Sequence, residues 1–114
     1  MDSILADGVL GLALPGISHT GETVLQHLQQ AAGITRFALY LTATVEGSYL
    51  ILGDPDTSWY DPSSLVWVKE QTGMWWAMEA KISVNGQDLV EGTFLLDSGT
   101  SFIGAPGVVF GLLA

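Results

Sequence analysis

Residues 94–106 read Phe94-Leu95-Leu96-Asp97-Ser98-Gly99-Thr100-Ser101-Phe102-Ile103-Gly104-Ala105-Pro106, an apolar run that leads one carboxylate into a turn of small residues. The apolar residues before Asp97 predict a strand that is covered on both faces. A carboxylate at the end of a buried strand needs hydrogen-bond donors, because its burial without them is costly. Gly99 lets backbone N–H groups approach closely, and Ser98, Thr100 and Ser101 supply hydroxyls. The stretch is therefore predicted to hold an anion, with Asp97 as the candidate functional residue.

The order Asp-Ser-Gly-Thr-Ser at 97–101, followed by Phe-Ile-Gly-Ala-Pro, resembles the active-site aspartate motif of the pepsin-like aspartic proteases. A competing interpretation is that Asp97 only caps a turn, as the aspartate of most Asp-Ser-Gly triplets does. A second stretch favours the family. Residues 7–15, Asp-Gly-Val-Leu-Gly-Leu-Ala-Leu-Pro, resemble the segment that ends the ψ-shaped loop in the amino-terminal lobe. Their glycines predict a short strand that passes close to another backbone.

The rest of the chain predicts one helix and about six strands. The helix is expected from Glu22 to Ala32, because its apolar residues recur at helical spacing, with Thr20 as N-cap and Gly33 as C-cap. Further strands are predicted at 37–42, 49–52, 65–68 and 75–84, with a return strand over 87–90 and then 93–96, and a short helical segment at 108–113. Asn85-Gly86 predicts a two-residue hairpin turn. The fold class is all-β and mostly antiparallel, and the resemblance implies a partial pepsin-like acid protease fold.

The resemblance also implies how the chain is divided. Residues 1–46 are expected to form the end of the N-terminal lobe and the strand between lobes. Residues 47–114 are expected to form the first half of the C-terminal lobe, with the active-site Asp motif. The apolar end of the sequence, 108–114, predicts an internal fragment of a longer protein, because exposed termini are rarely so hydrophobic.

Composition limits the possible partners. The chain has 114 residues, 48% of them hydrophobic, which is enough for one small domain with a core. Twelve acidic residues face three basic ones and give a net charge of −9, so neither a nucleic acid nor a membrane surface is an expected partner. The absence of cysteine excludes disulfides and thiolate metal sites. No cofactor is expected. No metal is expected either, because Asp54 and Asp56 lack the further acids that a calcium site needs.

A serine-hydrolase arrangement of Ser18, His19 and Asp97 is a weaker alternative. No nucleophile-elbow pattern surrounds Ser18, so a plain loop is the favoured interpretation. His27 is expected on the surface of the helix.

Aspartic proteolysis needs two carboxylates that share a proton and a water. By resemblance, Asp97 is the catalytic aspartate of the C-terminal lobe, with Gly99 offering its amide and Thr100 its hydroxyl. Ser98 stands where most members have threonine, whose hydroxyl braces the two aspartate motifs against each other. By the same resemblance, Ser98, Gly99, Thr100 and Ser101 form the active-site support. The chain contains one such motif, and the flap with its tyrosine is absent.

The predicted function is therefore an aspartic-type endopeptidase, of which this chain carries one catalytic aspartate. Its partners are a peptide or protein substrate, and either the missing lobe halves or a second copy to complete the site. Two alternatives stay open: a non-catalytic pepsin-like peptide-binding protein, and a homodimeric protease with one motif per chain. The resemblance implies a secretory, lysosomal or other acidic compartment.

Overall fold

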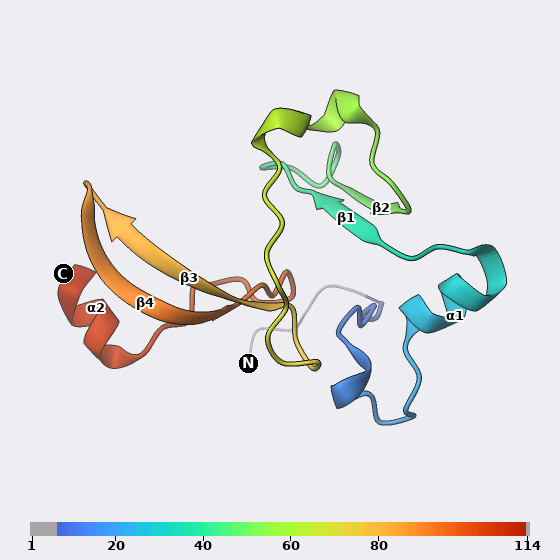
Figure 1. Ribbon diagram of the computed structural model, residues 1–114, viewed down its shortest axis with the longest axis horizontal. Helices are drawn as coiled ribbons and strands as arrows, with labels where there is room; N and C mark the ends of the chain where they lie inside the picture. The colour runs from blue at the N-terminus through green and yellow to red at the C-terminus, as the bar shows by residue number, and fades with distance from the viewer. Residues whose placement is uncertain (1–6, 114) are drawn as a thin grey trace. The chain divides into compact units, whose positions relative to one another are not determined.

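A computed structural model describes residues 7–113 of the chain (Figure 1). The chain divides into two compact units, Met1–Trp67 and Val68–Ala114, which we call unit 1 and unit 2. Unit 1 contains one α-helix and one strand pair: α1 (Val24–Ala32), β1 (Phe37–Tyr40) and β2 (Tyr49–Leu52). Unit 2 contains a longer strand pair and a second helix: β3 (Ala77–Val84), β4 (Gln87–Leu95) and α2 (Gly107–Leu113). Both strand pairs are antiparallel, so the all-β class is confirmed.

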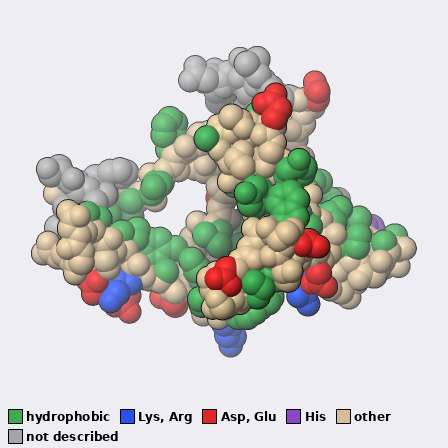
Figure 2. Space-filling view, turned by 90° about the horizontal axis from the view of Figure 1, so that it is seen from above, with side chains coloured by type: hydrophobic (Ala, Val, Ile, Leu, Met, Phe, Trp, Pro, Cys, Tyr) green, Lys and Arg blue, Asp and Glu red, His purple; other side chains and the backbone are tan. Residues whose placement is uncertain are grey.

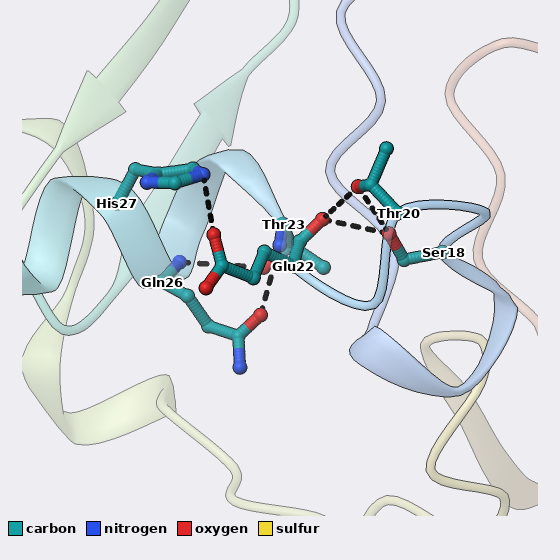
Figure 3. Close-up of polar contacts among 6 residues, drawn as sticks. All are labelled: Ser18, Thr20, Glu22, Thr23, Gln26 and His27. Carbon is teal, nitrogen blue, oxygen red and sulfur yellow. Dashed lines mark hydrogen bonds and ion pairs between the residues drawn. The ribbon is translucent and has the colours of Figure 1, made fainter.

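Helix α1 begins at a capping box. The Thr23 hydroxyl accepts a hydrogen bond from the Gln26 amide, and the Gln26 side chain accepts one from the Thr23 amide (Figure 3). The predicted N-cap at Thr20 is wrong, because glutamine three residues after Thr23 completes this reciprocal pair. The helix ends at Gly33 in the left-handed conformation with φ 68°, so the predicted C-cap is confirmed.

The strands β1 and β2 form a hairpin whose pairs run from Phe37 with Leu52 to Tyr40 with Tyr49. The Trp59 ring lies edge-on against both tyrosine rings, with centroids 4.8 and 5.0 Å away. Such aromatic contacts stabilise a hairpin that is otherwise too small to be stable alone. The lobe boundary predicted between 46 and 47 falls in the connection of this hairpin and stays a prediction.

The β3–β4 hairpin confirms the predicted turn and alternation. Its two turn residues, Asn85 and Gly86, have φ of 50° and 78°, the positive values that a type I′ turn requires. Along β3 the side chains of Met78, Ala80 and Ile82 are half-buried, whereas the intervening polar ones are exposed. The predicted gap between 90 and 93 is absent, and β4 runs unbroken to Leu95. A register shift after Ile82 leaves one residue of β4 unpaired.

Helix α2 packs against β4, and the predicted helical segment near 108–113 is confirmed. Among the described residues, the buried hydrophobic side chains are Ala77 and Val109. Many hydrophobic side chains lie on the surface instead, as Figure 2 shows in green. No helix of the described part of the chain is long and apolar enough to cross a bilayer.

Two strand predictions and one burial prediction are wrong. Residues 7–14 and 65–68 are irregular, and Val9 and Val66 are 84% and 76% exposed. A strand needs a neighbour for its backbone groups, and neither segment joins a strand pair within the described residues. Phe94 and Leu95 do belong to β4, but the predicted burial on both faces is wrong, because Leu95 and Leu96 are 55% and 62% exposed.

Candidate active site

The β3–β4 hairpin ends directly at Asp97. The Leu96 amide donates to the Trp76 carbonyl over 2.9 Å, which continues the pairing one residue past the last strand pair. The chain then turns over residues 97–100, where the Thr100 amide donates to the Asp97 carbonyl over 3.3 Å. We call residues 97–100 the Asp97 turn. The strand pair thus fixes the entry to this turn, and the turn fixes the direction of the carboxylate.

Each oxygen of the Asp97 carboxylate accepts one hydrogen bond. The Gly99 amide donates to Oδ1 over 2.9 Å, and the Thr100 hydroxyl donates to Oδ2 over 2.5 Å. A Cβ atom at position 99 would lie 3.2 Å from Oδ1, so a side chain there would crowd the carboxylate. Glycine therefore leaves room for the amide contact.

These two contacts determine how Asp97 ionises. The Thr100 hydroxyl, followed by the Gly99 amide, lowers the pKa of Asp97 below its ordinary value. Desolvation opposes this shift. The prediction that Asp97 ends a buried strand is wrong: Asp97 is exposed, and so are Leu95 and Leu96 before it. Its ionised form is therefore stabilised by both donors and by water.

The other two expected support residues behave differently. Ser98 and Ser101 are exposed, and within the described chain neither hydroxyl bonds to the Asp97 carboxylate. The structure thus brings Asp97, Gly99 and Thr100 together and leaves both serines outside their contacts. The catalytic and supporting roles of all five residues stay predictions.

A groove of about 740 Å³ lies beside the Asp97 turn in unit 2. Asp97 and Thr100 are among the residues that line it. Its walls are mainly apolar and come from β3, β4, the loop after the turn and α2; they include Ile82, Phe94, Leu96, Phe102, Ile103 and Val109. The sequence did not predict this groove. The apolar residues that directly follow the aspartate motif were the available signal.

The serine-hydrolase alternative finds no support in the geometry. The Ser18 hydroxyl donates to the Glu22 carbonyl over 2.6 Å and lies 3.2 Å from the Thr20 hydroxyl (Figure 3). His27 makes an ion pair with Glu22 over 3.2 Å, on the exposed side of α1. No contact between Ser18 and His19 is present in the described chain, so nothing there activates the hydroxyl as a nucleophile.

The described residues contain no group of three or more histidine, aspartate or glutamate side chains that could hold a metal ion. Asp54 and Asp56 have other roles. Asp54 pairs with Arg36 over 3.0 Å, and Asp56 accepts from the Ser58 amide over 2.8 Å at the start of a short 3-10 helix (Thr57–Trp59).

An all-β chain that presents an aspartate in an Asp-Ser-Gly-Thr turn, at the rim of an apolar groove, has the features of the aspartic protease class. The family described as eukaryotic aspartyl protease matches residues 1–112. The chain belongs to this family.

The curated relatives include three pepsins. The chain is 36% identical to pepsin A of Bos taurus over 108 residues, which cover 88% of this chain and 29% of that protein. It is 34% identical to pepsin F of Oryctolagus cuniculus over 116 residues, 93% of this chain and 29% of the relative. It is 33% identical to pepsin A of Sus scrofa over 108 residues, which cover 88% of this chain and 28% of that protein. The chain thus spans less than a third of the length of these relatives. No solved structure matches it.

Proposed function

We propose that this chain is part of an aspartic-type endopeptidase and that Asp97 is one of its two catalytic aspartates. One observation carries the proposal: in a member of the aspartyl protease family, both oxygens of an exposed carboxylate are oriented by donors beside a groove. Orientation by the Gly99 amide and the Thr100 hydroxyl keeps the carboxylate available to a bound water. It also favours the ionised form that a general base requires.

In the proposed reaction, one ionised and one protonated carboxylate flank a water molecule. The ionised carboxylate takes a proton from the water, whose oxygen bonds to the scissile carbonyl carbon, while the protonated one donates to the carbonyl oxygen. The carbon–nitrogen bond then breaks, and the leaving nitrogen takes up a proton. Two carboxylates that share a proton have separate pKa values, because the charge on one disfavours the charge on the other.

The second carboxylate comes, in this proposal, from polypeptide outside these 114 residues. This follows from the single aspartate motif in the chain and from the small share of the pepsin relatives that the chain spans. The substrate would be a peptide or protein that lies along the groove. A second copy of the chain is the other possible source of the missing carboxylate, and the experiment below separates the two.

The test compares Asp97→Asn with Asp54→Asn in the longer protein that contains this chain. Asp54 is exposed and lies in unit 1, and its surface ion pair is expected to contribute little, so the control removes the same charge elsewhere. Cleavage of a denatured protein substrate in acidic buffer is measured. We expect Asp97→Asn to lower the rate by at least about 10²-fold, the scale of one general acid–base group. Unchanged cleavage by that variant would contradict the proposal.

The same assay on the 114-residue chain addresses the alternatives. Cleavage that rises with the square of chain concentration and is lost in Asp97→Asn would assign the second carboxylate to a second copy. Peptide binding without cleavage, in both the longer protein and the chain, would instead indicate a non-catalytic binding protein.

A further inference from the structure

The turn between β3 and β4 places the single asparagine of the sequence directly before a glycine. Asn85 and Gly86 are both exposed and both have positive φ. In the described chain, neither the Asn85 side-chain amide nor the Gly86 backbone amide makes a hydrogen bond. A Cβ atom built at Gly86 would have no neighbour within 4 Å, so the turn is open to water on that side. An unhindered backbone nitrogen thus directly follows an unengaged side-chain amide.

We propose that Asn85 is a site of spontaneous covalent modification, in which its side-chain amide is lost by attack of the Gly86 nitrogen. The Gly86 nitrogen gives up its proton to water or hydroxide and forms a bond to Cγ of Asn85. The bond from Cγ to the side-chain nitrogen breaks, and that nitrogen takes up a proton from water and leaves as ammonia. A five-membered succinimide ring remains, which contains the Gly86 nitrogen and two carbonyl carbons.

Water then opens the ring in one of two ways. Attack at Cγ breaks its new bond to nitrogen and gives aspartate with an ordinary backbone. Attack at the backbone carbonyl carbon of residue 85 gives isoaspartate, whose chain continues through Cβ and Cγ. Water is the only co-reactant, and both products carry one additional negative charge. The lack of a Cβ at Gly86 is what leaves its nitrogen accessible for the first step.

The isoaspartate product does not fit the turn. A type I′ connection has two residues of fixed geometry, and an additional backbone carbon changes both its length and its direction. The pair Val84 with Gln87 lies directly beside the turn and is expected to be lost. Asp88 bonds to Lys81 over 2.8 Å and to Ser83 over 2.6 Å, which holds the next part of the hairpin. The pairs that lead to the Asp97 turn are therefore expected to persist.

The experiment incubates the full chain in mildly alkaline buffer and follows its peptides by mass spectrometry. We expect loss of the unmodified Asn85 peptide and a product with the mass change of NH₂ to OH, at a rate that rises in proportion to hydroxide. Isoaspartate is detected by enzymatic methylation of its carboxylate. The chain unfolded in urea gives the intrinsic reactivity of the same Asn-Gly pair.

The matched control is Asn85→Gly, which keeps two residues that tolerate positive φ and removes the side-chain amide. We expect no product from this variant. An Asn85 peptide that stays unmodified in the folded chain, while the chain in urea is converted, would overturn the proposal. Equal product from the control variant would overturn it as well.

Discussion

Two carboxylates in unit 2 are held by turns of similar composition, Glu70 before β3 and Asp97 after β4. The Glu70 carboxylate accepts bonds from the amides of Thr72 and Gly73 and from the Thr72 hydroxyl. The Asp97 carboxylate accepts one bond from an amide and one from a hydroxyl. In both turns the hydrogen bonds lower the pKa of the carboxylate, chiefly through the Thr72 amide at Glu70 and through the threonine hydroxyl at Asp97.

The two threonines are used differently. The Thr72 hydroxyl also accepts hydrogen bonds from the Met74 and Trp75 amides over 3.1 and 3.0 Å. It therefore connects the half-buried Glu70 carboxylate to the backbone of the next residues. In the described chain, the Thr100 hydroxyl bonds to Asp97 alone, and that carboxylate is exposed at the groove. The same kinds of hydrogen bond therefore connect several backbone groups in the Glu70 turn and leave an exposed carboxylate in the Asp97 turn.

The largest expected effect separates the two carboxylates by activity. Under the proposed function, Asp97→Asn in a longer protein that contains this chain is expected to lower proteolysis by at least about 10²-fold, whereas Glu70→Gln leaves it within a few-fold of the unmodified protein. Glutamine still accepts hydrogen bonds from the turn, so the second variant removes charge without removing the acceptor. The rates are compared at equal concentrations of folded protein. A similar loss in both variants would mean that the Glu70 turn is part of the catalytic machinery.

The second prediction separates the two threonines by stability. Thr72→Val removes a half-buried hydroxyl and leaves the Met74 and Trp75 amides without it as acceptor. We expect the free energy of unfolding to fall by about 1–2 kcal/mol. Thr100→Val removes an exposed hydroxyl and is expected to change it by less than about 0.5 kcal/mol. Urea unfolding of the chain measures both. A greater loss of stability from Thr100→Val would reverse the comparison.

The two turns also differ in how far the sequence predicted them. The Asp97 contacts depend on residues two and three positions away, and short-range rules describe such turns well. The same holds for Gly33 and for Asn85-Gly86, where the conformation is set locally. The Glu70 turn was missed, although the polar run 70–73 with its terminal glycine is a turn signal.

Longer-range features were harder to predict. Residues 65–68 and 94–96 are apolar and have the composition of buried strands. Whether such a segment is a strand, and whether its faces are covered, depends on partners that its own periodicity does not reveal. The groove beside Asp97 was not predicted for the same reason, because its walls come from two strands, a loop and α2.

The third prediction concerns pH. Because the hydrogen bonds lower the folded-state pKa of Asp97, its contribution to stability is complete above the ordinary carboxyl pKa of about 3.9. The contribution is lost as pH falls through the lower folded-state value. Thr100→Val removes the larger cause of the shift, so the pKa of Asp97 is expected to rise toward the ordinary value. Carboxyl-carbon NMR titration measures it, and Glu70 in the same spectrum is the internal control. A rise at Glu70 alone would contradict the assignment.

The smallest expected effect concerns Ser98. Its hydroxyl makes no bond to the Asp97 carboxylate in the described residues, although the family resemblance implies that a hydroxyl at this position braces one aspartate motif against the other. Ser98→Ala is therefore expected to leave the pKa of Asp97 and the stability of the 114-residue chain unchanged. NMR titration and urea unfolding measure them, and a change in either would mean that Ser98 supports the turn from within this chain. If activity of the longer protein falls while the isolated chain is unaffected, the partner of Ser98 lies in polypeptide outside these residues. That outcome would also favour a second aspartate from the same polypeptide.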